Sequence, residues 1–256
     1  MKKVTAGIDG LDKMLNGGLP RGRCILVCGG PGSGKTILSM QFLRHGAVQL
    51  DEPGLYVSLD EDISQLKQEM ASFGWDLEKL EKKGRLAIVD ASPIRHIPRE
   101  VKVGDLWVGK RNFSSVSLIE IIKNNVEKIN AKRIVIDPIT ALTFLYSDVS
   151  EKRTAILDLF ETLTHLGTTN LITNELRSVT LEREIRSEEF LAHGVILLHV
   201  FVSDKEIVRG VQVEKMRGIA HDDQIRPYRI TENGIEVFPQ EKSIIGIPIT
   251  ASALQT

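Results

Sequence analysis

The chain has 256 residues, of which 42 % are hydrophobic and 26 % charged, and its 33 basic and 34 acidic side chains leave a formal net charge of −1. This balance excludes an argument from overall charge for binding to nucleic acid or to an acidic membrane. The longest apolar run, 194–202, is well below the about 18–20 residues that span a bilayer, and the N-terminus lacks the apolar core of a signal peptide. We therefore expect a cytoplasmic protein without membrane insertion.

Apolar runs typical of strands alternate with helical patterns over most of the chain. The strand patterns cover 23–28, 55–59, 85–90, 133–137 and 169–173, and the helical patterns cover 35–49, 62–72, 76–82, 115–129 and 150–166. This alternation predicts an α/β fold with a mostly parallel sheet covered on both faces. From residue 194 the chain becomes β-rich, with strands over 194–202 and 206–215 and a hairpin turned at Asn233-Gly234.

The length favours one large domain, which we place at 1–238, followed by a tail over 239–256. Segments 91–113 and 174–190 also carry no regular pattern, and loops of this length are usually functional or disordered. The two cysteines, Cys24 and Cys28, lie on one apolar strand. Because an extended strand holds them too far apart for a disulfide, we expect buried, reduced thiols.

The strongest motif is a phosphate-binding loop between the strand pattern 23–28 and the helical pattern 35–49. The run Gly29-Gly30-Pro31-Gly32-Ser33-Gly34-Lys35-Thr36 matches G-x-x-x-x-G-K-[ST] in the strand–loop–helix context that the motif requires. Its glycines let backbone N–H groups converge on phosphate oxygens at a helix N-terminus. We expect Lys35 to reach the β- and γ-phosphates of ATP or ADP, Thr36 to ligate Mg²⁺, and the following Ile37 to join the nucleotide-binding set.

Carboxylates follow two of the predicted strands. Asp137 ends the strand 133–137, the usual position of the Mg²⁺-side carboxylate in P-loop enzymes, although an Asp there also suits a turn cap. Asp60, Glu61 and Asp62 follow the strand 55–59. A carboxylate beyond the carboxyl end of such a strand can orient the attacking water, whereas acids at a helix N-terminus also offset the helix dipole. The residues alone leave both interpretations open.

A basic pair closes the strand 206–215. Lys215 and Arg217 are two positions apart, so an extended backbone directs both side chains to one face. Taken in isolation, this pattern is typical of a solvated strand end.

Together these residues resemble the KaiC family within the RecA/RadA/DnaB superfamily of P-loop ATPases, over about residues 4–238. Each supporting run is short, but their order and spacing are specific. Besides the P-loop and the strand that ends in Asp137, the runs are Thr5-Ala6-Gly7-Ile8-Asp9-Gly10-Leu11-Asp12, Gly17-Gly18-Leu19-Pro20, Gln41-Phe42-Leu43, Asp51-Glu52-Pro53-Gly54, Ser72-Phe73-Gly74-Trp75-Asp76 and Lys215-Met216-Arg217-Gly218 with His221.

The resemblance implies a RecA-like core that hydrolyses ATP slowly at subunit interfaces of a homo-oligomeric ring, a hexamer. Asp60 and Glu61 match the family's two adjacent glutamates that activate the hydrolytic water, with an Asp in the first place. Lys215 and Arg217 match a pair that reaches the γ-phosphate of the neighbouring subunit, where such cations stabilise the transferred phosphoryl group. Further residues are implied around the nucleoside: Ser72, Met216, Ile219, His221, Thr231 and Glu232.

Some KaiC domains phosphorylate a Ser-Thr pair just before the strand that here begins at Gly194. An ungapped count back from Lys215 places Glu189-Phe190 at those positions, with Ser187 the nearest hydroxyl. We therefore expect hydrolysis without stable self-phosphorylation.

Two other functions remain open from the sequence: a DNA-stimulated ATPase, and a switch in which ATP drives assembly or docking of a protein partner. Superfamily relatives bind DNA through loops that correspond here to 141–153 and 176–187. Segment 176–187 is only weakly basic and has no aromatic residue, whereas segment 95–111 holds several basic residues and Trp107. Single-strand binders combine a basic groove with stacking aromatics, so the support for nucleic acid is weak. The ATPase rate with and without single-stranded DNA, measured beside size-exclusion chromatography with and without nucleotide, distinguishes these alternatives.

Overall fold

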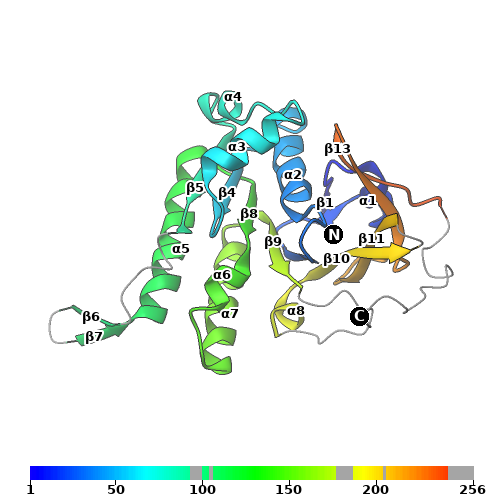
Figure 1. Ribbon diagram of the computed structural model, residues 1–256. Coiled ribbons are helices and arrows are strands. Elements are labelled where there is room, and N and C mark those ends of the chain that lie inside the picture. Colours follow the sequence, from blue (N-terminus) through cyan, green and yellow to red (C-terminus); the bar gives the residue numbers. More distant parts are fainter. Residues whose placement is uncertain (93–99, 104–105, 177–186, 204–205, 242–256) are drawn as a thin grey trace.

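The apolar runs predicted as strands line up in one central sheet. The computed structural model describes residues 1–92, 100–103, 106–176, 187–203 and 206–241, and its main sheet has nine strands in the order β13-β12-β11-β10-β3-β9-β8-β4-β5 (Figure 1). The strands from β10 to β5 pair in parallel, and β11, β12 and β13 continue the sheet in antiparallel fashion. This confirms an α/β fold with a mostly parallel core and a strand-rich C-terminal part.

The strand bounds lie within a few residues of the predicted ones. They are β3 Cys24–Gly29, β4 Gly54–Ser58, β5 Leu86–Asp90, β8 Arg133–Asp137, β9 Thr169–Glu175, β10 Gly194–Ser203, β11 Glu206–Met216, β12 Arg226–Thr231 and β13 Gly234–Val237. The final hairpin differs by one position, because Thr231 pairs with Gly234 and the turn consists of Glu232 and Asn233. Gly234, at φ 105°, is thus the first residue of β13.

Helices cover both faces of the sheet. α2 (Lys35–Gln49), α3 (Ile63–Ala71) and α4 (Leu77–Lys82) pack into one apolar core, and α5 (Lys110–Ile129), α6 (Ile139–Thr143) and α7 (Val149–His165) into the other. The strands supply both cores by alternation: on β3, Ile25 and Val27 face the first core, and Cys24, Leu26 and Cys28 face the second. Both cysteines are buried and free, as expected.

Several short elements were not predicted. They are β1 (Lys3–Val4), β2 (Leu19–Pro20), α1 (Asp9–Met14), α6, α8 (Ser187–Leu191) and the hairpin of β6 (Glu100–Val103) and β7 (Leu106–Gly109). The hairpin projects from the start of α5 (Figure 1), and α5 itself begins before the predicted residue 115. Each of these elements is too short to show a hydrophobic period, so tertiary contacts must stabilise it.

A buried guanidinium connects the start of β8 to three other segments. Arg133 is fully buried, and its side chain donates to Glu52 at 2.8 Å and to the carbonyl oxygens of Thr5 and Phe42 at 3.0 and 2.9 Å. It also lies over the Phe42 ring, 4.5 Å from the centroid. The guanidinium also explains the glycine at position 46 of α2. A Cβ on Gly46 would come within 2.4 Å of the Arg133 Nε, so a larger residue would not fit there. The fold thus sets α2 against β8 through one charged side chain.

We expect Arg133→Met to lower the free energy of unfolding by about 3–5 kcal/mol, because it leaves the buried Glu52 carboxylate with less compensation. Lys82→Met is the matched control, since Lys82 is 79 % exposed and its ion pair with Glu78 is 3.8 Å long; such surface pairs contribute about 0–1 kcal/mol. Urea unfolding of the three proteins measures the difference. Equal midpoints for both variants would show that Arg133 is not a structural anchor.

Candidate functional site

The predicted P-loop joins β3 to α2 and is braced by the C-terminal strands. Gly34, at φ 83°, is the N-cap of α2, and this left-handed backbone conformation favours glycine. A Cβ at Gly34 would also lie 3.1 Å from Ile230 of β12. The Tyr228 hydroxyl donates to the Ser33 carbonyl oxygen at 2.6 Å. The loop is therefore held in a phosphate-binding shape by residues about 195 positions away in the chain.

Lys35 begins α2 and turns its ammonium back over the loop. Its Nζ donates to the carbonyl oxygens of Gly29 and Gly30 at 3.0 and 3.1 Å. Burial lowers the pKa of Lys35, and the carboxylates of Asp137 and Glu175 act in the opposite direction. Glu175 ends β9 and pairs in register with Gly29, so this carboxylate also belongs to the phosphate end of the site.

Asp137 accepts hydrogen bonds from three hydroxyl groups. Thr36 and Tyr56 donate to its Oδ2 at 2.9 and 2.7 Å, and Thr173 donates to its Oδ1. Asp137 is only 6 % exposed, and it does not cap α6, which begins after Pro138 without a side-chain cap. The turn-cap alternative is therefore wrong for this residue. The predicted Mg²⁺ pair, Thr36 and Asp137, lies in direct contact.

The side-chain oxygens of Thr36 and Asp137 are suitable ligands for Mg²⁺. This ion prefers oxygen ligands and is usually held by one or two protein groups together with water and substrate phosphates. Among the described residues there is no group of three or more His, Cys, Asp or Glu side chains that would form an all-protein metal cage. Tyr56 and Thr173 were missed by sequence reasoning. Both stand inside apolar strands, where the sequence gives no sign that a hydroxyl contacts Asp137.

The three acids after β4 have different surroundings. Asp62 caps α3, accepting from the backbone N–H groups of Ser64 and Gln65 at 2.9 and 3.0 Å. Asp60 is exposed and lines a cavity of about 300 Å³ together with Glu175, Pro138, Thr140, Ala141, Phe144 and Leu145. The helix-N-terminus interpretation therefore holds for Asp62, and the water-orienting role stays a prediction for Asp60 and Glu61.

Glu61 is half-buried, and its surroundings perturb its carboxyl group. Burial raises its pKa to about 7, and the negative charges of Glu69 and Asp137 act in the same direction. Its backbone N–H donates to the Ser58 hydroxyl at 3.1 Å, and the same hydroxyl donates to its carbonyl oxygen at 2.6 Å. A carboxyl group that titrates near neutral pH is suited to general-base catalysis.

Lys215 and Arg217 lie far from the P-loop of their own chain. Lys215 pairs with Val195, and Val195 pairs with Leu26 of β3, whereas the P-loop begins three residues later, at Gly29. Three strand residues correspond to roughly 10 Å, and β10 intervenes between β11 and β3. Both side chains instead donate to carbonyl oxygens of α8: Lys215 to Glu189 at 2.8 Å and Arg217 to Phe190 at 2.8 Å.

The residues predicted around the nucleoside divide into two groups. Ser72 is the C-cap of α3, and Thr231 and Glu232 lie at the β12–β13 turn. This turn lies close to the segment after α3, since a Cβ on Gly234 would be 2.8 Å from the Trp75 ring. The other three follow Lys215, and the segment that they begin reaches α1, where the N–H of Asp222 donates to the Met14 carbonyl oxygen at 2.8 Å. These three are Met216, Ile219 and His221, and the Met216 side chain is buried in the core.

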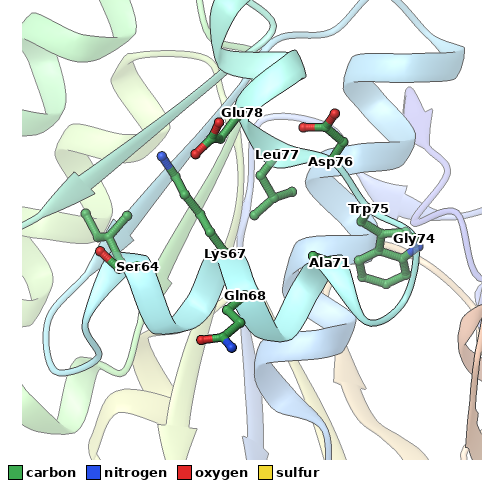
Figure 2. Close-up of a pocket in the computed structure, with 10 residues that line it drawn as sticks. Ser64, Lys67, Gln68, Ala71, Gly74, Trp75, Asp76, Leu77 and Glu78 are labelled. Carbon is green, nitrogen blue, oxygen red and sulfur yellow. The ribbon is translucent and has the colours of Figure 1, made fainter.

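A larger pocket, of about 590 Å³, opens between α3 and α4 and contains none of the predicted site residues. Figure 2 shows Lys67 reaching from α3 toward Glu78 and Trp75 closing one end. The Lys67 ammonium forms an ion pair with Glu81 at 2.6 Å.

Most of the segments considered for nucleic acid lie outside the described residues, including 177–186 and the side chains of 95–111; the tail over 242–256 also lies outside them. Segment 141–153 is described and exposes Phe144 and Val149 at 67 % and 72 %. Within the described part of the chain, no helix is both long and apolar enough to cross a bilayer.

Comparison with known proteins identifies the class. The family model for the KaiC ATPase matches residues 4–242. The circadian clock oscillator protein KaiC of Picosynechococcus sp. is 38 % identical over 240 residues, which cover 93 % of this chain and 45 % of that protein. A UPF0273 protein of Thermotoga maritima is 36 % identical over 243 residues, covering 94 % of this chain and 98 % of that protein.

The crystal structure of a KaiC-like protein from the archaeon Pyrococcus horikoshii superposes with a TM-score of 0.78 at 37 % identity, covering 93 % of this chain and 99 % of that one. The chain belongs to the KaiC family of ATPases, and it spans about half the length of the cyanobacterial KaiC proteins that it matches. Its membership makes it a RecA-type, ATP-binding ATPase, as the resemblance implied.

We expect kcat/KM for ATP hydrolysis to fall as the pH drops through about 7. The pKa of Glu61 is raised to about 7, and a protonated Glu61 can no longer act as the general base. An unperturbed glutamate would lose its charge only near pH 4.3. Initial rates at low ATP concentration between pH 5.5 and 8.5 measure this acid-side decrease of the rate. In Glu61→Gln the decrease should disappear together with most of the rate. A decrease that persists in that variant would assign the titration to another group.

Proposed function

We propose that this chain binds Mg-ATP and hydrolyses it slowly at sites shared between neighbouring subunits of a homo-oligomeric ring, a hexamer. One observation carries the proposal: the P-loop and the pair Lys215 and Arg217 lie at opposite ends of the same sheet. A pair that cannot serve its own P-loop is suitably placed to serve the P-loop of the next copy.

Within one subunit, the P-loop amides from Gly29 to Thr36 and the Lys35 ammonium bind the phosphates of ATP. Thr36 and Asp137 would hold Mg²⁺, which neutralises phosphate charge and orients the β- and γ-phosphates. Ile37, in the first turn of α2, and Ser72, Thr231 and Glu232 complete the nucleotide site on this side. Asp60 and Glu61 orient the attacking water and accept its proton.

The neighbouring subunit contributes the second half of the site. Its Lys215 and Arg217 stabilise the charge that develops on the transferred phosphoryl group, and its Met216, Ile219 and His221 lie next to the nucleoside. The division of these residues into two groups at separate places on one subunit supports this assignment.

Turnover releases phosphate to water rather than to the protein. α8 carries Glu189 and Phe190 where an acceptor pair would stand, and the Ser187 hydroxyl donates to Glu188 at 3.2 Å. In-line transfer needs an acceptor oxygen about 3 Å from the phosphorus, and neither Glu189 nor Phe190 carries a hydroxyl group that could take that place. This supports an ATPase that does not phosphorylate itself at the usual position.

Subunits carrying Lys35→Ala and subunits carrying Arg217→Ala should each be inactive alone and active when mixed. Lys35→Ala subunits lack the cation for the γ-phosphate of the ATP that they bind, but they still provide Arg217 to a neighbour. Arg217→Ala subunits retain an intact P-loop. Phosphate release from mixed, reassembled protein measures the recovery. A mixture as inactive as its two components would mean that Arg217 acts within its own subunit or not at all.

Prolonged incubation with Mg-ATP should leave the intact mass of the protein unchanged while free phosphate accumulates. Intact-mass spectrometry detects a gain of one phosphate, and Ser187→Ala is the matched control. A heavier species that this substitution removes would make the protein an autokinase.

A further inference from the structure

The side chains of Lys215 and Arg217, at the C-terminal end of β11, donate to carbonyl groups of α8. Lys215 donates to the Glu189 and Phe190 carbonyl oxygens at 2.8 and 3.3 Å, and Arg217 donates to that of Phe190 at 2.8 Å. The carbonyls of a final helical turn have no partner within the helix, and the helix dipole attracts positive charge to this end. The direction in which both side chains extend therefore depends on where α8 lies.

α8 is too short to define its own position. It has five residues, Ser187–Leu191, and an isolated helix of this length is not stable in water. Its Phe190 ring is 58 % exposed, so this side chain adds little burial. What fixes α8 must come from its other side chains.

Leu191 packs against the second apolar core, and Glu188 supplies the charged anchor. It is only 1 % exposed, and its carboxylate forms an ion pair with Lys152 of α7 at 2.7 Å. Burial favours its neutral form, but the hydrogen bond and charge of Lys152, together with hydrogen bonds from the Glu188 backbone N–H and the Ser187 hydroxyl, outweigh burial and lower the pKa of Glu188. A buried carboxylate is strongly restrained to its partner because separation would leave the charge uncompensated.

We propose that Glu188 is a positioning residue for ATP hydrolysis: its ion pair with Lys152 fixes α8, and α8 aligns Lys215 and Arg217 for the neighbouring subunit. The inference rests on the shared site proposed above. Lys152 stands near the start of α7, and α7 follows α6 and the Asp137 end of β8 in the chain. The residue that pairs with Glu188 thus lies on α7, which follows α6 and the subunit's own Asp137 in the chain.

The test is Glu188→Gln, which keeps the shape of the side chain and removes its charge. We expect ATP affinity, measured by calorimetry, to stay unchanged and kcat to fall by about 10–100-fold, the loss that a small misplacement of a transition-state group causes. Glu78→Gln, at a carboxylate that is 63 % exposed, is the matched control and should keep full turnover.

Mixing separates positioning from a general structural defect. Glu188→Gln subunits mixed with Lys35→Ala subunits should recover turnover, because the latter donate well-aligned cations to an intact P-loop. If thermal unfolding shows that Glu188→Gln does not fold, Lys152→Met takes its place in the same assays. Full kcat in the variant, or a loss that mixing does not restore, would overturn the inference.

The Arg217→Ala and Lys35→Ala mixture is run in parallel. If that pair fails to complement, the shared site itself is wrong. If it complements while Glu188→Gln or Lys152→Met keeps full turnover, only the role of Glu188 is wrong.

Discussion

The arrangement of the site depends on the burial of one guanidinium. Arg133 begins β8 and Asp137 ends it, so a single short strand carries a buried cation at one end and the carboxylate proposed to hold Mg²⁺ at the other. The Arg133 side chain contacts Phe42 and Gly46 of α2 and pairs with Glu52. Because α2 also begins with Lys35, the elements that carry the P-loop lysine and Asp137 are linked twice, through Arg133 and through the hydrogen bond from Thr36 to Asp137.

The choice of a charged residue for this position has a physical reason. A buried Arg needs hydrogen-bond partners for its donors, and here Nε and Nη1 donate to the loop before β4, to the N-terminal segment and to α2. An apolar side chain of equal volume could fill the space but would not specify these three partners. The same burial makes Gly46 necessary in the middle of a helix, where glycine is otherwise unfavourable.

The parallel core and the P-loop could be predicted because both depend on local pattern. Apolar runs of strand length and a glycine-rich loop before a helix need no tertiary information. Tyr56 and Thr173 could not be found in this way, since a hydroxyl on a buried strand acquires its role only when β4 and β9 flank β8. The anchor of α8 was equally hidden, because Lys152 and Glu188 become partners only through packing of α7 against α8.

The positions of the P-loop and of Lys215 and Arg217 on one sheet have a consequence for symmetry. A contact that joins one end of the sheet in one copy to the other end in the next is head-to-tail, and such contacts form closed rings or open filaments. In an open row of subunits, the P-loop of the last subunit lacks the cations of a neighbour. In a closed ring, every subunit has the same surroundings. In the proposed arrangement, the protein's own concentration would therefore act on its active site as a ligand does, by mass action.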